Sequence, residues 1–245
     1  MRNIKLTIEY DGTRYSGWQI QKNTLLTIQQ KLQDALTVIN KRPVKVQGAS
    51  RTDAGVHAEG QVANIYLDVP IPIDRIPMAL NRKLPGDIIC KFAENVDDDF
   101  HARYDTVAKK YRYRIYNSKL PSVFVRNYVY HYIYNIDIKA VKEASRYFLG
   151  RHDFSSFQSS GSYAENTVKT INSLEVIKKG KELWIEIEGS GFLYNMVRII
   201  VGTILEVSMG KIKISDIEDI IKSCDREQAG YTVPASGLTL LEVYY

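Results

Sequence analysis

Cysteine is scarce in this chain of 245 residues, which contains only Cys90 and Cys224. Each lies in an apolar or helical context, and neither belongs to a CxxC pair. This usage excludes a disulfide framework and a cysteine-based zinc site. We therefore expect two reduced thiols, as in proteins of the cytosol.

The chain also lacks the short motifs that bind common cofactors and catalytic metals. No GxGxxG, GxxxxGK(S/T), HExxH or GxSxG sequence occurs. Dinucleotide and P-loop sites, zinc protease sites and serine hydrolase chemistry therefore have no support. The four histidines, at positions 57, 101, 131 and 152, are not at ligand spacing. We expect neither a metal nor a cofactor.

Long apolar runs are absent as well. No stretch approaches the roughly 18 residues that a membrane span needs. The amino-terminal sequence MRNIKLTIEYDG passes directly into a strand pattern, without a signal peptide. These absences predict a soluble cytoplasmic protein that does not bind a membrane.

What the chain does have is a globular composition with an excess of positive charge. Hydrophobic residues make up 44% and charged residues 25%, and the net charge is +5. This length can bury one sizeable core or two modest ones. The basic balance fits a polyanionic partner, although many basic proteins bind none.

The first part of the chain alternates strand and helix patterns in the order β-α-β-β-α-β. Apolar and polar residues alternate over 4–10, which is typical of a half-buried strand. Thr27 and Gln30 form a capping-box signal for a helix that ends before Pro43. The other expected elements are strands at about 43–48, 60–69 and 87–96 and a short helix at about 73–83.

The second part repeats this order loosely. Asp137 is the expected cap of a helix, and Gly150 lies just past its expected end. The other expected elements are strands at about 106–117, 127–134, 168–178 and 182–189 and helices at about 193–208 and 214–223. The pattern predicts an α+β protein with two halves, residues 1–104 and 105–245, each a sheet covered on one face by helices.

One loop combines charged residues with small ones. In QGASRTDAGVHAEGQVANIY, residues 47–66, Arg51, Asp53 and His57 lie among glycines and alanines. As an ordinary turn, Asp53 would form an Asx-type bend ahead of Gly55. As a site, Arg51 would help to keep Asp53 charged, which a nucleophile requires.

Arg198 is the only charged residue between Glu188 and Glu206, within an apolar helix pattern. Burial of a guanidinium without a partner is very costly, so we expect a carboxylate to reach it. The alternative is that Arg198 extends to solvent along its aliphatic stem or caps a structural pair.

Tyrosine is abundant, with 17 residues. Tyr111 and Tyr113 share one face of an expected strand, and Arg112 and Arg114 share the other. A second alternating set is Tyr128, Tyr130, Tyr132 and Tyr134. Aromatic residues favour strands for packing reasons alone. Aromatic faces beside basic residues also stack unpaired bases and hold phosphates.

Six sequence blocks, which together span nearly the whole chain, carry a family resemblance. They are YDGTRYSGWQIQ (10–21), RTDAGVHAEGQVA (51–63), FHARYDTVAKKYRY (100–113), GRHDFSSF (150–157), GSGFLYNMVRIIVGTI (189–204) and AGYTVPASGLTLLEV (229–243). In this order they resemble the TruA-type tRNA pseudouridine synthases.

The resemblance implies isomerisation of uridine to pseudouridine in RNA, without a cofactor. The expected substrate is the anticodon stem-loop of tRNA, at about positions 38–40, where a base can be turned out of its stack. Asp53 matches the nucleophile, and Arg51 matches the residue that displaces the target base. Tyr111 matches the residue that packs on the base, and Arg198 matches the partner of the aspartate.

The resemblance also implies a fold and an assembly. Family members resemble two fused ferredoxin-like, or RRM-like, halves with the active-site cleft between them, and they act as homodimers on tRNA. The Asp loop falls in residues 1–104, and the Tyr strand and Arg helix fall in residues 105–245. The candidate RNA contacts are Arg14, Lys22, His57, Lys109, Lys110 and Arg112.

The sequence departs from the common family pattern at a few positions. Ser50 stands where a glycine often precedes the RTD motif, and Tyr194 and Asn195 stand where histidines are frequent. These departures leave room for a paralogue with another RNA target, and two rival functions are also open. The chain could be a paralogue that modifies another RNA such as rRNA, a catalytically silent RNA-binding protein on the same fold, or a hydrolase of small nucleosides.

Overall fold

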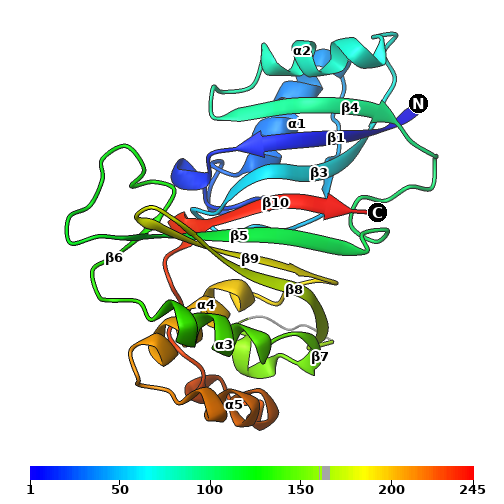
Figure 1. Ribbon diagram of the computed structural model, residues 1–245. Helices are drawn as coiled ribbons and strands as arrows, with labels where there is room; N and C mark the ends of the chain where they lie inside the picture. Colours follow the sequence, from blue (N-terminus) through cyan, green and yellow to red (C-terminus); the bar gives the residue numbers. More distant parts are fainter. Residues whose placement is uncertain (160, 162–165) are drawn as a thin grey trace. The chain divides into compact units, whose positions relative to one another are not determined.

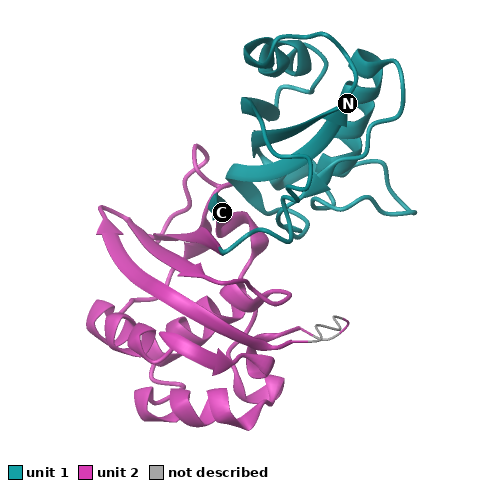
Figure 2. Cartoon of the chain, turned by 90° about the vertical axis from the view of Figure 1, so that its right-hand side faces the viewer, with its two compact units in different colours: residues 1–107, 239–245 teal, residues 108–238 magenta. Residues whose placement is uncertain are grey.

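The computed structural model describes residues 1–159, 161 and 166–245, which divide into two compact units (Figure 2). Unit 1 comprises residues 1–107 and 239–245, and unit 2 comprises residues 108–238. Of the helices described, none is long and apolar enough to span a membrane.

Unit 1 is built on one sheet with the strand order β4-β1-β3, extended by β10 and β2 on the far side of β3. Its elements are β1 (Arg2–Tyr10), α1 (Ile28–Asn40), β2 (Gln47–Gly48), β3 (His57–Leu67), α2 (Ile76–Asn81), β4 (Ile88–Asn95) and β10 (Leu238–Tyr244). All pairs are antiparallel except β3 with β10, which is parallel. The order β4-β1-β3-β2 with two crossover helices is the ferredoxin-like arrangement.

The core of unit 1 follows the predicted alternation. Ile4, Leu6 and Ile8 of β1 are fully buried. α1 lies behind the sheet in Figure 1, and α2 packs against β4. Burial of this apolar face is the main favourable contribution to the stability of the unit.

The predicted cap of α1 is confirmed on one side only. The backbone N–H of Gln30 donates to the Thr27 hydroxyl at 3.3 Å. The Gln30 side chain does not return to Thr27; it donates to Asp34, one turn further along, at 2.7 Å.

The strand expected at 43–48 is reduced to the two residues of β2. The backbone around Val46 bonds to side chains of α1 where a strand would bond to a neighbour: its N–H donates to Gln33 at 3.2 Å, and its carbonyl accepts from Gln29 at 2.8 Å. β3 begins at His57, earlier than expected.

Unit 2 has an antiparallel sheet in the order β5-β9-β8-β7, with β6 parallel beside β5. Its elements are β5 (Ala108–Asn117), β6 (Tyr130–Tyr132), α3 (Ile138–Arg146), β7 (Gly150–Asp153), β8 (Val168–Lys179), β9 (Glu182–Gly189), α4 (Met196–Ser208) and α5 (Ile217–Ser223). Short 3-10 helices in the two units are Gly12–Arg14, Ile73–Arg75, Ser155–Phe157, Ile214–Asp216, Arg226–Gln228 and Ala235–Gly237.

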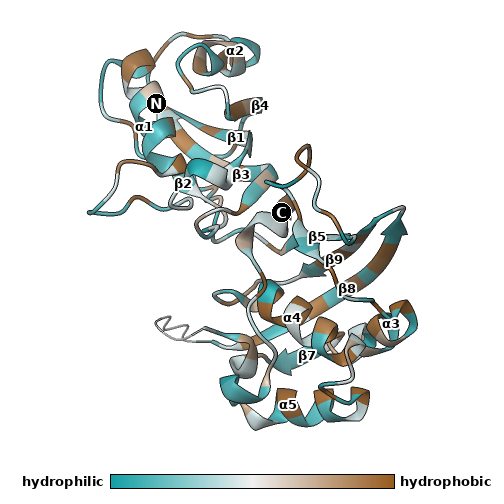
Figure 3. Ribbon diagram, turned by 90° about the vertical axis from the view of Figure 1, so that its left-hand side faces the viewer, coloured by the Kyte–Doolittle hydropathy of each residue, from teal (hydrophilic) through white to brown (hydrophobic). Residues whose placement is uncertain are grey.

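One face of this sheet is apolar and packs against helices. Tyr113 of β5 and Ile185 of β9 are buried, and α3 and α4 pack together on this side (Figure 1). Figure 3 shows hydrophobic and hydrophilic residues alternating along β8. The steps β5-α3-β8-β9-α4 repeat β1-α1-β2-β3-α2, so the predicted α+β fold of two similar halves is confirmed.

Several boundaries in unit 2 differ from the sequence expectation. α3 is capped as predicted, because Asp137 accepts from two backbone N–H groups at 2.9 and 3.1 Å. It ends at Arg146, and Gly150 begins the short strand β7, which has no apolar pattern to reveal it. β6 is shorter than expected, and at its end the Asn117 amide donates to the carbonyls of Tyr132 and Tyr134.

Candidate active site

Asp53 lies in the loop that connects β2 to β3, and a separate segment, residues 10–18, holds that loop in place. The backbone N–H of Trp18 donates to the carbonyl of Thr52 at 3.0 Å. The hydroxyl of Tyr10 lies 2.7 Å from the hydroxyl of Thr52, and both residues are buried. The residue before Asp53 is therefore fixed through both its backbone and its side chain.

The residues after Asp53 form a tight turn. The carbonyl of Asp53 accepts from the N–H of Val56 at 3.1 Å, and the N–H of Gly55 donates to the carbonyl of Tyr15 at 3.3 Å. Gly55 has a φ of 78°, a left-handed conformation that favours glycine. Asp53 is half-buried and Arg51 is exposed, so the carboxylate stands on a fixed bend. The ion pair of Asp53 with Arg51 stays a prediction.

Two glycines of the segment 10–18 allow it to approach the Asp53 loop. Gly17 has a φ of 91°, and a Cβ atom there would lie 2.6 Å from the carbonyl oxygen of Thr52. A Cβ atom on Gly12 would overlap the carbonyl of Val56. The glycines of the block at residues 10–21 therefore allow the backbone of this segment to pack against the backbone of the Asp53 loop. The sequence alone did not reveal this role.

Gln61 of β3 supports the start of the same loop. Its side-chain oxygen accepts from the N–H of Ser50 at 3.2 Å, and its side-chain nitrogen donates to the carbonyl of Ser50 at 2.9 Å. Both residues are buried. Both bonds go to backbone atoms of Ser50, so they do not depend on the replacement of the more common glycine by serine.

His57 is buried at the start of β3. Its Nδ1 accepts from the backbone N–H of Gly12 at 3.0 Å and lies 3.2 Å from a carboxylate oxygen of Asp11. The ring therefore supports the segment around the Asp53 loop from inside unit 1. Contact between His57 and RNA would require the ring to leave this position.

In unit 2, Tyr111 is a buried residue of β5 that packs against an aromatic ring outside the predicted site. Its ring meets Phe192 edge to face, with centroids 5.3 Å apart and an interplanar angle of 85°. Phe192 lies in the same block as Arg198, residues 189–204, where only its aromatic character could have marked it. Such a pair fixes the orientation of both rings.

Arg198 lies in the first turn of α4 and is half-buried. Its Nε donates to the carbonyl of Val233 at 2.7 Å, and its Nη1 donates to the side-chain oxygen of Asn195 at 2.5 Å. Asn195 also donates to the Ser159 hydroxyl at 2.9 Å. These acceptors of Arg198 are neutral, so they orient the guanidinium without neutralising it. The pairing with Asp53, which belongs to unit 1, stays a prediction.

Two candidate RNA contacts on β5 bind the same carboxylate of β9. Lys110 lies 2.8 Å from one oxygen of Glu186, and Arg112 lies 2.7 Å from the other. Burial alone raises the pKa of Glu186, but the hydrogen bonds from Lys110 and Arg112 outweigh it and hold the pKa below its usual range. Lys109, the third basic residue here, is half-buried.

The other basic candidates belong to unit 1. Arg14 donates to Asp87 at 2.6 Å, and the Tyr15 hydroxyl donates to the same carboxylate at 2.6 Å. Burial raises the pKa of Asp87, but the hydrogen bonds from Tyr15 and Arg14 together with the charge of Arg14 hold it below its usual value. Lys22 is exposed in the following loop.

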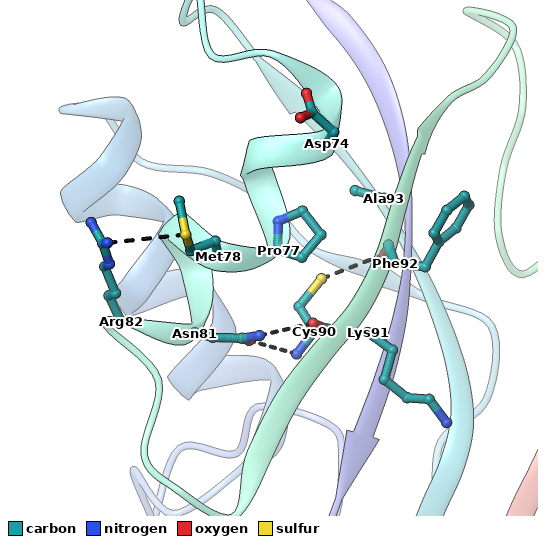
Figure 4. Close-up of a pocket in the computed structure, with 9 residues that line it drawn as sticks. All are labelled: Asp74, Pro77, Met78, Asn81, Arg82, Cys90, Lys91, Phe92 and Ala93. Carbon is teal, nitrogen blue, oxygen red and sulfur yellow. Dashed lines mark hydrogen bonds between the residues drawn. The ribbon is translucent and has the colours of Figure 1, made fainter.

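A pocket between α2 and β4 of unit 1 contains none of the predicted site residues (Figure 4). At its floor Asn81 exchanges two hydrogen bonds with the backbone of Cys90, at 2.8 and 2.9 Å. Burial raises the pKa of the Cys90 thiol to about 12, which disfavours the reactive thiolate. Among the residues described, no group of three or more His, Cys, Asp or Glu side chains could hold a metal ion.

Comparison with known proteins shows which family this chain is similar to. A family model described as tRNA pseudouridine synthase matches residues 6–105 and 144–245. A chain from Acetivibrio thermocellus named tRNA pseudouridine synthase A is 53% identical over 245 residues, which is 100% of both chains. Chains of the same name from Thermoanaerobacter sp. and Ruminiclostridium cellulolyticum are 48% and 49% identical, again over 100% of each chain.

Proposed function

Because the chain belongs to the tRNA pseudouridine synthase family, we propose that it isomerises uridine to pseudouridine in tRNA. The observation that carries this proposal is the 53% identity to a tRNA pseudouridine synthase A over the full length of both chains. The anchored Asp53 loop supports it, because a nucleophile needs a fixed carboxylate with an open approach.

The reaction needs no second substrate. The bond between N1 of the uracil and C1′ of the ribose breaks, the ring turns, and a bond between C5 and C1′ forms. The proton on C5 is released, and N1 gains a proton. No net oxidation or reduction takes place, so side chains that place charge and move a proton are sufficient.

In this proposal Asp53 is the catalytic carboxylate. It acts by addition to C1′, by addition to C6 of the base, or by assisting an elimination that passes through a glycal. Arg198 pairs with Asp53 and keeps it ionised, since an opposite charge favours the charged form. Arg51 displaces the target base from the stack.

Tyr111 packs on the detached base in this proposal. Its edge-to-face contact with Phe192, at 5.3 Å, holds the ring in one orientation. The amino-terminal half, residues 1–104, supplies the Asp53 loop, and the carboxy-terminal half, residues 105–245, supplies Tyr111 and Arg198. That the residues of the two halves come together around one base is part of the proposal.

The finer expectations belong to the same proposal. The substrate is the anticodon arm of tRNA, and the enzyme acts as a cytoplasmic homodimer. Lys22 and Lys109 bind phosphates. For Arg14, Lys110 and Arg112 a phosphate would share the cation with the carboxylate that already binds it.

Release of tritium from tRNA transcripts labelled with uridine tritiated at C5 tests the proposal, because only isomerisation displaces that hydrogen. We expect time-dependent release from tRNA and none from free uridine. Intact binding of tRNA without any release would favour the silent RNA-binding reading. Formation of free uracil from free uridine, with the tritium retained on C5, would favour the hydrolase of small nucleosides.

A further inference from the structure

The connection between β5 and β6, residues 118–129, exposes large apolar side chains at its tip. The exposed fractions are 75% for Leu120, 66% for Val123 and 91% for Phe124. Single exposed apolar residues are ordinary, but three within five positions form a patch of the kind that binds a partner. We call residues 118–129 the β5–β6 loop.

The base of this loop is closed by hydrogen bonds within unit 2. Ile115 to Asn117 of β5 pair in parallel with Tyr130 to Tyr132 of β6. The ring of His131 bonds to the carbonyl of Ser118 at 2.8 Å. With its ends held together, the segment is a compact loop of the Ω type, in which function is frequent. Figure 1 shows it projecting past the end of β5.

The tip of the loop is also folded on itself. The N–H of Tyr128 donates to the carbonyl of Val125 at 2.8 Å, and the Arg126 guanidinium donates to the carbonyl of Val123 at 2.7 Å. The exposed residues are therefore presented on a turn that is already formed, which lowers the entropy cost of binding.

The charge of the surrounding sequence identifies the kind of partner. Residues 106–136 include no Asp or Glu but contain six Lys and Arg residues. Lys110 and Arg112 bind Glu186, and Arg114 binds Glu182, so these three are balanced on the sheet. Lys119 and Arg126, the two cations of the loop itself, flank the apolar tip.

These features favour RNA over a second copy of the chain. A two-fold contact through the loop would bring together two loops that each carry Lys119 and Arg126 and no acidic residue, so only like charges would meet. An anionic partner with flat apolar faces matches the loop better. Unpaired nucleotides offer both, because their bases stack on aromatic rings and their phosphates attract cations.

We propose that the β5–β6 loop binds unpaired nucleotides of the tRNA substrate outside the target uridine, with Phe124 stacked on a base and Lys119 and Arg126 near phosphates. The identity of the RNA rests on the proposed function. Of the alternating tyrosines expected to stack bases, Tyr132 is buried, and the Tyr130 hydroxyl lies 3.4 Å from that of Tyr231, so these two are less suited to this.

Binding of an unmodified tRNA transcript to Phe124→Ala, measured by fluorescence anisotropy, tests the proposal. We expect the Kd to rise about tenfold, the usual loss for one stacked base. Phe124→Trp keeps a stacking ring and is expected to bind within about twofold of wild type. The matched control is Phe92→Ala, which removes a ring that is 56% exposed in unit 1 and is expected to leave the Kd unchanged.

Lys119→Glu gives a second arm that does not depend on the ring. We expect a weaker Kd and a shallower dependence of log Kd on log salt, because one phosphate contact is lost. Unchanged tRNA binding in both Phe124→Ala and Lys119→Glu would overturn the proposal. A fall in sedimenting mass of Phe124→Ala with unchanged tRNA binding would overturn it in favour of a second copy.

These outcomes are distinct from failure of the proposed function. A wild-type protein that binds tRNA but releases no tritium would refute the isomerase, while the binding experiment would still test the loop.

Discussion

The two units share a β-α-β-β order but connect its second and third strands differently. In unit 2 the strands β8 and β9 pair as far as Lys179 with Glu182 and close through a tight turn at Gly180, whose φ is 58°. In unit 1 the corresponding second strand, β2, has two residues, and the connection to β3 is the Asp53 loop.

This difference shows how a repeated topology can carry a site in one half only. A tight hairpin satisfies its own backbone through the ladder. When the second strand is shortened, the freed backbone must find other partners. In unit 1 these are the side chains of α1 and Gln61 and the backbone of the segment 10–18. The loop thereby becomes long enough to present a carboxylate without losing its anchorage.

Removal of the positive charge of Arg198, a residue of unit 2, is expected to have the largest effect. Arg198→Met should lower the single-turnover rate of pseudouridine formation by about 100-fold, or about 3 kcal/mol. The acid limb of the pH–rate profile should move to higher pH, because an ionised carboxylate without its cation protonates more readily. A profile that keeps its shape would count against the pairing with Asp53.

Gly17→Ala tests the anchorage of the loop in unit 1. The new Cβ would meet the Thr52 carbonyl in a left-handed conformation, so we expect a loss of about 2 kcal/mol in the free energy of unfolding and a large loss of activity. Gly180→Ala, in the β8–β9 turn of unit 2, is the matched control. Gly180 also has a positive φ, but nothing lies within 4 Å of its Cβ position. Urea titration of both variants should rank Gly17→Ala as the more damaging, and equal losses would show that the contact of Gly17 with the Asp53 loop is not important for stability.

Asn195→Gly tests whether Arg198 needs the acceptor that orients it. Asn195 has a φ of 61°, so glycine keeps the backbone while the hydrogen bond to Arg198 is lost. We expect a tenfold lower rate, or about 1.4 kcal/mol, in the wild-type background and no further loss in Arg198→Met. Cys224→Gly, at a φ of 53° after α5, controls for the backbone change. An equal loss in both backgrounds would assign Asn195 a structural role alone.

Glu186→Gln removes a buried carboxylate of β9 in unit 2 and should have the smallest effect. Loss of the carboxylate that binds Lys110 and Arg112 should cost about 1 kcal/mol at pH 7. Since the pKa of Glu186 is lowered in the folded state, this stabilisation is fully present above the ordinary value of 4.5. It should disappear as the pH falls through the lowered pKa.

Urea titrations at pH 7 and at acid pH check this difference. Glu188→Gln on the same strand is the control, because its contact with Asn172 is long, at 3.4 Å. A Glu186→Gln deficit that persists unchanged in acid would show that the carboxylate charge is not its cause.

Much of the fold could be predicted from local signals. The alternation in β1, the Thr27 and Asp137 caps and the apolar pattern of α4 are each legible within a short window. β10 was not predicted, and its burial does not follow its residue types: Leu238, Thr239 and Leu240 alternate apolar and polar but are all buried. Its parallel pairing with His57 and Ala58 depends on contacts far apart in the chain.

In the candidate site, too, some residues could be predicted from local signals and others could not. The Asp53, Tyr111 and Arg198 assignments came from short motifs. The groups that support them did not: Gly17, Phe192 and Asn195 act through contacts between segments that are separate in sequence or through a left-handed backbone. Residue type alone does not report such contacts.

The most direct test of the account is carbodiimide mapping of pseudouridine on unmodified tRNA and rRNA transcripts, with wild type and Asp53→Ala side by side. We expect stops in the anticodon arm of tRNA with wild type, and none with Asp53→Ala although that variant folds and binds tRNA. Stops of equal strength with Asp53→Ala would contradict the central role of the Asp53 loop.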